Sequence, residues 1–293
     1  MSNVKLNTLP CPTYSWLGVN DTQRELDEFA VQTVKITQSK TTTSVTSDAT
    51  FEISTDSGDS KFAVMFISTD KNAQVRTTVD VSESSSVKLV QVFESKAQTV
   101  ADVNAKLADN ARFELVQLYL GTADTVSEIN TELSGRKSEF TANIGYLLGG
   151  EDKLDLNLVA RHHGRKTKSQ IIAKGVMNDS ASKIFKGTID FVNGSAGAVG
   201  SENEDVVLIG DKVINKTVPL ILCAEEDVEG SHGASIGRVD EAHIFYMQSR
   251  GIPDDKIAEL MAQSKIAQIV NTIGDEETQS RINSTLGRGN EDE

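Results

Sequence analysis

One candidate for chemistry in this 293-residue sequence is a histidine flanked by small residues. His232 lies in the segment Gly230-Ser-His-Gly-Ala-Ser-Ile-Gly237, where a β-rich pattern gives way to a helical one. Imidazole is a ligand that iron and zinc accept, and neighbouring glycines allow the backbone to turn tightly. A loop histidine taken alone is more often structural, so this segment leaves both interpretations open.

Two more histidines lie in the most basic segment of the chain, Arg161-His-His-Gly-Arg-Lys-Thr-Lys168. Adjacent residues of a strand point to opposite faces, so His162 and His163 are poorly placed to bind one metal together. We expect a solvated strand end and turn here; contact with an anion or an acidic partner is the alternative.

The two cysteines, Cys11 and Cys223, are too few and too far apart for a disulfide scaffold or a cysteine-based zinc module. Cys223 lies in an apolar run, where we expect it to behave as a small hydrophobe rather than a reactive thiolate. An acidic cluster follows, and it predicts a solvated edge more strongly than a site for a hard cation: Glu225, Glu226, Asp227 and Glu229.

Several enzyme motifs are missing from the sequence. It contains neither the GxxxxGK[ST] pattern of a phosphate-binding P-loop nor the G-x-S-x-G of an α/β serine hydrolase. The glycine-rich residues 194–200 lack G-x-G-x-x-G and precede no helical pattern, so we expect a turn or bulge there.

The composition narrows the class of protein further. The chain has 29 Lys and Arg against 43 Asp and Glu, a net charge of −14, which argues against a broad nucleic-acid surface or binding to anionic membranes. Hydrophobic residues make up 38%, enough for a sizeable core. The N-terminus has no apolar segment typical of a secretory signal, and apolar runs fall well short of the ~20 residues of a membrane span. We therefore expect a cytoplasmic protein.

Short β-type segments separated by turn residues dominate the middle of the chain. Residues 154–158 alternate apolar and polar side chains with a period of two, which is typical of a strand. Such spacing favours a sandwich, a barrel or a β-solenoid, and no strict internal repeat selects among them. The other predicted strands are 75–81, 87–93, 113–120, the neighbourhood of Leu133, 140–146, 171–176, 206–209 and, with a looser pattern, 184–186 and 189–191.

Helical spacing replaces this pattern near Ser235. A first helix is predicted to end at Gly251-Ile-Pro253, a second to run from Pro253 to Gly274, and a third to cover residues 276–286. An acidic segment near the N-terminus, residues 22–34, is predicted to be helical. The expected organisation is a partly helical N-terminal extension (1–40), a β core (41–235), a C-terminal helical region (236–287) and a disordered tail (288–293).

Residues 230–252 combine the histidine–glycine segment with a helix that ends in Phe-Tyr-x-x-x-Arg-Gly-Ile. This long ordered pattern resembles the SufB/SufD family, the scaffold subunits of the SUF iron–sulfur cluster assembly machinery. Further segments that resemble the family are 9–20, 161–165, 174–176, 185–189 and 206–211.

The resemblance implies a fold and a function. The fold would be mainly β: a right-handed parallel β-helix (β-solenoid) with an N-terminal extension and a C-terminal α-helical appendage. The function would be that of a non-catalytic scaffold, which pairs with a SufB-type subunit through the ends of the β-helices. A SufC-type ABC ATPase would dock on the C-terminal helices, as in the SufBCD complex.

Within the family, the chain is more similar to SufD than to SufB. SufB has a cysteine where this chain has Glu204, and His232 matches the histidine of the SufD interface site. The resemblance therefore implies that His232 is an iron or cluster ligand at the subunit interface, with a transient iron–sulfur cluster there and no intrinsic cofactor. Some SufD proteins have a cysteine where this chain has Gly230. The residues implied in partner binding are Val239, Phe245, Tyr246, Arg250 and Ile252.

Two alternatives come from other classes of protein. A β-solenoid polysaccharide lyase or hydrolase would use the carboxylates of residues 225–229, but there is no export signal, and aromatic residues, which would stack on sugars, are only 5%. A homodimeric adaptor unrelated to clusters is the third. The sequence leaves open whether the isolated chain forms a homodimer, which cluster it handles, and whether it handles iron, electrons or sulfur.

Overall fold

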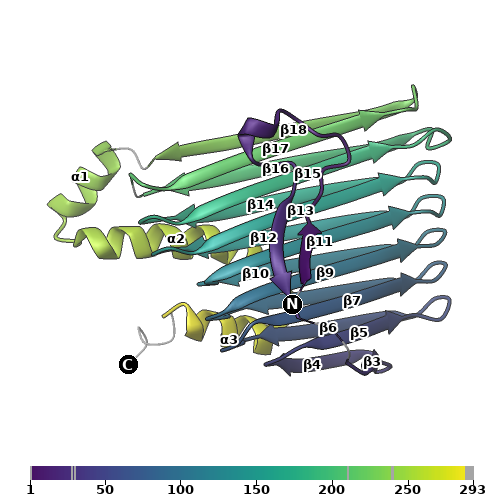
Figure 1. The fold of residues 1–293 in the computed structure, drawn as a ribbon, viewed down its shortest axis with the longest axis horizontal. Coiled ribbons are helices and arrows are strands. Elements are labelled where there is room, and N and C mark those ends of the chain that lie inside the picture. The colour runs from purple at the N-terminus through teal and green to yellow at the C-terminus, as the bar shows by residue number, and fades with distance from the viewer. Residues whose placement is uncertain (1, 28, 30, 210, 239–240, 288–293) are drawn as a thin grey trace.

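The protein is a parallel β-solenoid, as the family resemblance implied (Figure 1). A computed structural model describes residues 2–27, 29, 31–209, 211–238 and 241–287. The chain alternates between two parallel eight-stranded sheets, so each coil adds one strand to each sheet. Sheet I contains β3 (Thr33–Ile36), β5 (Ala49–Ser54), β7 (Ala73–Val81), β9 (Gln98–Leu107), β11 (Asp124–Leu133), β13 (Lys153–His162), β15 (Ser182–Phe191) and β17 (Ile214–Cys223). Sheet II contains β4 (Lys40–Val45), β6 (Ser60–Ile67), β8 (Ser86–Phe93), β10 (Arg112–Leu120), β12 (Glu139–Leu148), β14 (Lys168–Met177), β16 (Ala198–Leu208) and β18 (Val228–Arg238).

The interior between the sheets is filled by every second residue of each strand. Leu154, Leu156 and Leu158, which set the period of two in the sequence, are all buried in this core. Because neighbouring parallel strands are in register, equivalent side chains stack from coil to coil. The rings of Phe113 and Phe140, for example, stack with centroids 5.5 Å apart.

What repeats from coil to coil is the backbone conformation of the turns, not the type of residue at each position. One corner of successive coils is formed by a residue in the left-handed conformation, and these residues differ in type: Gly58, Ser84, Asn110, Lys137, Lys166 and Gly197. A glycine is required where stacked turns approach closely. A Cβ at Gly164 would lie 2.2 Å from the carbonyl oxygen of Gly135 in the preceding coil.

Three helices follow the last strand, in the places that the sequence predicted. They are α1 (Glu241–Ser249), α2 (Asp254–Val270) and α3 (Glu276–Thr285). Apolar residues of α2 and α3, among them Ile266, Ile269 and Ile282, pack on the outer face of sheet II and form a second hydrophobic cluster with residues such as Val90 and Leu118. α1 lies away from the sheets, near the finish of β18 (Figure 1).

The helix predicted over residues 22–34 is wrong. β2 (Thr22–Leu26) pairs antiparallel with β1 (Ser2–Leu6), and the solenoid already begins at β3. The only helical element described before the solenoid is one 3₁₀ turn, η1 (Ser15–Leu17). Pairing with a distant segment outweighed the local helical tendency of residues 22–26.

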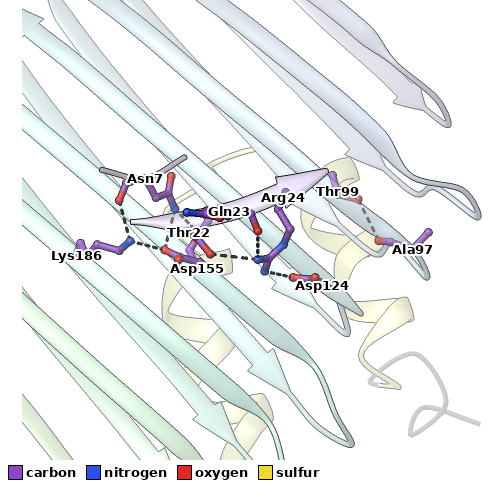
Figure 2. A network of polar contacts seen from close by, with 9 residues as sticks. All are labelled: Asn7, Thr22, Gln23, Arg24, Ala97, Thr99, Asp124, Asp155 and Lys186. Carbon is purple, nitrogen blue, oxygen red and sulfur yellow. Dashed lines mark hydrogen bonds and ion pairs between the residues drawn. The ribbon is translucent and has the colours of Figure 1, made fainter. Parts of the chain in front are cut away.

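Polar contacts hold this N-terminal ribbon on the outer face of sheet I (Figure 2). The Lys186 ammonium lies 2.9 Å from Asp155 Oδ1 and donates to the Asn7 carbonyl oxygen at 2.9 Å. The Asn7 amide donates to Asp155 Oδ1 at 2.8 Å, and Arg24 pairs with Asp124 at 2.8 Å. Lys186 and Asp155 are both buried, so the ribbon seals an ion pair against the sheet.

The observed boundaries differ slightly from those expected for the β core. The first solenoid strand starts at Thr33 rather than at residue 41, and the last ends at Arg238 rather than at residue 235. The tail, 288–293, lies outside the described residues. None of the described helices has the length and hydropathy needed to cross a bilayer.

Candidate functional site

The final end of the solenoid, formed by β17 and β18, is not covered by any strand that the structure describes. Each of these strands pairs on one side only among the described residues, and neither contains a buried residue. Ile214 and Ile236 are 53% and 44% exposed. Partly buried Ile221 and Val228 extend the core up to this surface. The final end therefore presents two unpaired strand edges and the open end of an apolar core.

His232 lies in this surface, on strand β18 rather than in a loop. It is directly beside Glu202 of β16 in the parallel register and is exposed because no strand covers it. Gly230, two residues earlier, is tightly placed: a Cβ there would lie 3.0 Å from the Phe191 ring and 3.1 Å from Ile221. A cysteine at position 230 would require these neighbours to shift.

Beneath the final end, the interior contains a charged network beside apolar core residues such as Phe185 and Phe191. Glu204 accepts hydrogen bonds from the Tyr146 hydroxyl at 2.9 Å and the Thr217 hydroxyl at 2.6 Å, and it forms an ion pair with Lys183. Lys183, Tyr146 and Glu204 are fully or almost fully buried. Burial lowers the pKa of Lys183, against the opposing effect of Glu204, and burial raises the pKa of Tyr146.

Glu202 adds a second carboxyl group to this interior. It is 3% exposed, and burial, followed by the charge of Glu204, raises its pKa to about 7. Its carboxyl group lies over Gly187 of β15, where a Cβ would be 2.4 Å from the carboxyl carbon. The absence of a side chain at Gly187 therefore leaves the room that the Glu202 carboxyl group occupies.

Lys183, Tyr146 and Glu202 were not predicted as site residues from the sequence. The strand pattern could have indicated two of the buried charges. Glu202 and Glu204 are an even number of residues from Ala198 and Val206 on β16, so they face the same core as these two residues. Charged residues at inward positions of a strand are expensive to bury unless they are paired. They are therefore candidates for function once the period is known.

The paired histidines point to opposite faces, as predicted. His162 is fully buried, with its ring nitrogens 2.7 Å from Thr167 Oγ1 and 2.8 Å from Ser169 Oγ. Burial, followed by the charge of His163, lowers the pKa of His162 to about 4. His163 is exposed on the outer face beside Glu132 at 2.6 Å. The solvated position expected for the pair is thus wrong for His162, whose role is structural.

The remaining candidates do not converge with His232 on one site. Cys11 and Cys223 are both exposed; Cys223 ends the edge strand β17, so it does not pack as an interior hydrophobe. Glu225 accepts a hydrogen bond from the Gly194 backbone, and this bond, with those from Glu226 and Asp227, lowers its pKa. A carboxyl group of lowered pKa is a poor proton donor at neutral pH. The described residues contain no group of three or more His, Cys, Asp or Glu arranged to hold a metal.

The predicted partner-binding residues lie on and beside α1. Phe245 and Tyr246 are 71% and 57% exposed, and the Arg250 guanidinium lies 5.3 Å from the Tyr246 ring centroid. Ile252, just after the helix, is half-buried. Val239 lies outside the described residues.

Comparisons with known proteins agree with this architecture. The family model described as "SUF system FeS cluster assembly, SufBD core domain" matches residues 33–265, from the first residue of β3 into α2. The chain is 32% identical to the iron–sulfur cluster assembly protein SufD of Bacillus subtilis (strain 168) over 139 residues, 47% of this chain and 32% of that protein. It is 24% identical to SufD of Escherichia coli (strain K12) over 156 residues, 53% of this chain and 37% of that protein.

A plant protein is also similar. The iron–sulfur cluster assembly SufBD family protein ABCI8, chloroplastic, of Arabidopsis thaliana is 30% identical over 115 residues, 39% of this chain and 21% of that protein. The matches thus span well under half the length of each of these relatives. The family model, in contrast, covers most of this chain, including the strands that build the final end. The chain therefore belongs to the SufB/SufD family of iron–sulfur cluster assembly proteins.

Proposed function

We propose that this chain is a non-catalytic scaffold subunit that pairs with a SufB-type subunit through its final end. The observation that carries the proposal is the pair of unpaired edges of β17 and β18, with exposed Ile214 and Ile236 beside them. A parallel edge strand offers a row of unsatisfied backbone donors and acceptors, and strand addition from a partner satisfies them. A second solenoid stacked on this end would also cover the apolar core, since solenoid ends need a cap.

A SufC-type ABC ATPase would dock on α1. An exposed Phe–Tyr pair with a stacked arginine has the composition of an interaction hot spot, because Tyr and Arg are enriched in such spots. Phe245 and Tyr246 do not contribute to the two hydrophobic clusters of the described fold. These two side chains are therefore not needed for packing of the core. The docking surface and the solenoid interface would then lie on different elements.

His232 would act at the solenoid interface as a ligand of iron or of a transient cluster. It is exposed on β18, within the surface that a SufB-type partner would cover, and imidazole is a suitable ligand for iron. We expect that His232→Ala lowers the yield of cluster on the assembled complex, measured by anaerobic absorption and iron and sulfide content. A full yield would remove the ligand role from His232.

The docking proposal is tested by co-purification of the full chain with the SufB-type and SufC-type proteins of the same organism. The double variant Phe245→Ala/Tyr246→Ala is expected to lose capture of the ATPase while it keeps capture of the SufB-type subunit. The matched control is Tyr14→Ala/Trp16→Ala, which removes another exposed aromatic pair, from the N-terminal ribbon. Equal ATPase capture by all three proteins would contradict docking on α1.

Point variants are preferable to deletion of the helical region. α2 and α3 cover apolar residues of sheet II such as Val90 and Leu118. A truncated chain would expose this face, and a loss of binding could then reflect misfolding.

A further inference from the structure

Glu202 and His232 are two residues of metal-ligating type that strand register places side by side at the final end. They lie directly side by side on β16 and β18 in parallel register. Neighbouring strands of a sheet are ~4.8 Å apart, and side chains at paired positions leave the sheet on the same side. Both residues therefore leave sheet II on its interior side at the open end, in adjacent strands.

The Glu202 carboxylate is uncommitted. Within the described part of the chain it forms no hydrogen bond and no ion pair, whereas Glu204 beside it forms both. The Lys183 ammonium, which lies in the same part of the interior, is paired with Glu204. The Glu202 carboxyl group therefore has no hydrogen-bond or ion-pair partner among the described residues at a position that is 3% exposed, and a bound cation would supply one.

The backbone around Glu202 makes room for this carboxylate. The side chain crosses the interior to Gly187 of β15, where even a Cβ would lie 2.4 Å from the carboxyl carbon. Gly187 pairs with Pro219 of the edge strand β17. The carboxylate is therefore held one layer beneath the open surface that carries His232.

We propose that Glu202 and His232 together form a two-ligand half-site for ferrous iron at the final end. This inference rests on the proposed function, in which His232 is a ligand of iron or of a transient cluster at the subunit interface. A carboxylate oxygen and an imidazole nitrogen suit Fe²⁺. Two ligands from one chain leave the remaining positions to water or to the partner subunit, in accord with the lack of a three-ligand group among the described residues.

The test is binding of Fe²⁺ alone to the full chain under anaerobic conditions, measured by equilibrium dialysis with iron analysis. The unaltered chain is expected to bind one equivalent saturably, and Glu202→Gln and His232→Ala are each expected to weaken binding at least tenfold. The matched control is Glu229→Gln, which removes an exposed carboxylate on β18, the strand of His232, but at a position that faces the other side of the sheet. This variant should bind Fe²⁺ as the unaltered chain does. Equal binding by Glu202→Gln, or no saturable binding by the unaltered chain, would overturn the half-site.

A second variant tests whether Glu202 coordinates Fe²⁺ directly or attracts it only by its charge. Gly187→Ala keeps the Glu202 carboxylate but displaces it, and it should also weaken Fe²⁺ binding at least tenfold. If the thermal midpoint of that variant shows misfolding, Glu202→Asp, which retracts the carboxylate by one methylene, replaces it. Binding that is lost in Glu202→Gln but kept in the displaced variants would mean that Glu202 acts by charge alone, and would overturn its role as a ligand.

Co-purification distinguishes failure of this inference from failure of the proposed function. Glu202→Gln should still capture the SufB-type and SufC-type partners, because its carboxylate is not part of the exposed edge. If the unaltered chain captures neither partner, the proposed function fails whatever the iron result. If capture is normal and Glu202→Gln binds iron normally, only the half-site fails.

Discussion

The two ends of the solenoid are built differently. At the first end, β3 and β4 have four and six residues, and each still has a buried apolar residue, Ile36 and Val45. At the final end, β17 and β18 have ten and eleven residues and no buried one. Short strands with lysines are a common protection of sheet edges, and Lys35 and Lys40 lie on the first two. The chain thus protects one edge and leaves the other available for pairing.

The interiors behind the two ends also differ. The first coils are filled with apolar side chains such as Phe51, Ile53 and Met65. The last coils contain the buried charged residues Lys183, Glu202 and Glu204 at inward positions. Buried charges add little to stability compared with well-packed apolar residues, so their position next to the unprotected edge points to function rather than to folding.

The largest effect, on the free energy of unfolding, is expected from removing the Lys183 ammonium from the final coils. Lys183→Met leaves the carboxylates of Glu204 and Glu202 buried without an ammonium, and this should lower the free energy of unfolding by about 3–5 kcal/mol. The measurement is urea or thermal unfolding followed by circular dichroism.

A double variant provides the control for this charge effect. Lys183→Met/Glu204→Gln removes one carboxylate together with the ammonium, so it should recover much of the loss. If both variants lose the same stability, packing of the lysine stem rather than charge pairing supports this coil.

Much of the solenoid could be predicted from the sequence, but not its coiling. The alternation at residues 154–158 predicted β13, and Gly251-Ile-Pro253 predicted the break between α1 and α2. The parallel coiling came from the family resemblance, because the repeat is one of backbone conformation. Residues as different as Ser84, Asn110 and Lys137 take the same left-handed corner.

The candidate site was less accessible to sequence reasoning. His232 was identified through the family resemblance, but its neighbour Glu202 is 30 positions earlier in the chain and becomes adjacent only through strand register. Register is a non-local property that short patterns do not determine. The prediction of a helix over residues 22–34 was wrong for a related reason, because β2 depends on pairing with β1.

The second prediction compares the same type of change at the two ends. Ile236→Lys puts an ammonium on the unprotected edge and should weaken binding of the SufB-type subunit at least tenfold, because the charge would be buried without a partner. Val34→Lys, at a similarly exposed site on β3, should leave the affinity unchanged. The measurement is a titration of the immobilised chain with the partner.

The outcome of that titration also tests the assignment of the edges. Equal weakening by both substitutions would mean that the two ends take part alike in binding. Weakening by Val34→Lys alone would assign pairing to the first end and would contradict pairing through β17 and β18.

The smallest effect, again on stability, is expected where the N-terminus of α3 contacts β4 at the first end. Asp275 is the N-cap of α3: it accepts from the Thr278 backbone at 3.1 Å, and it pairs with Lys40 of β4 at 2.6 Å. The Lys40 and Thr278 side-chain bonds lower the pKa of Asp275 to about 2. Asp275→Ala should therefore lower stability by about 1 kcal/mol, mostly through the cap, since exposed ion pairs contribute little.

The pH dependence of that loss tests its cause. The folded-state pKa of Asp275 is depressed, so its contribution is complete above the unfolded value of about 4 and is lost as the pH falls toward about 2. The difference between the Asp275→Ala and unaltered chains should thus shrink over that interval, with binding of the SufB-type subunit unchanged at neutral pH. A difference that is independent of pH would mean that the side chain acts by packing, and a loss of partner binding would show that the first end is not independent of the final one.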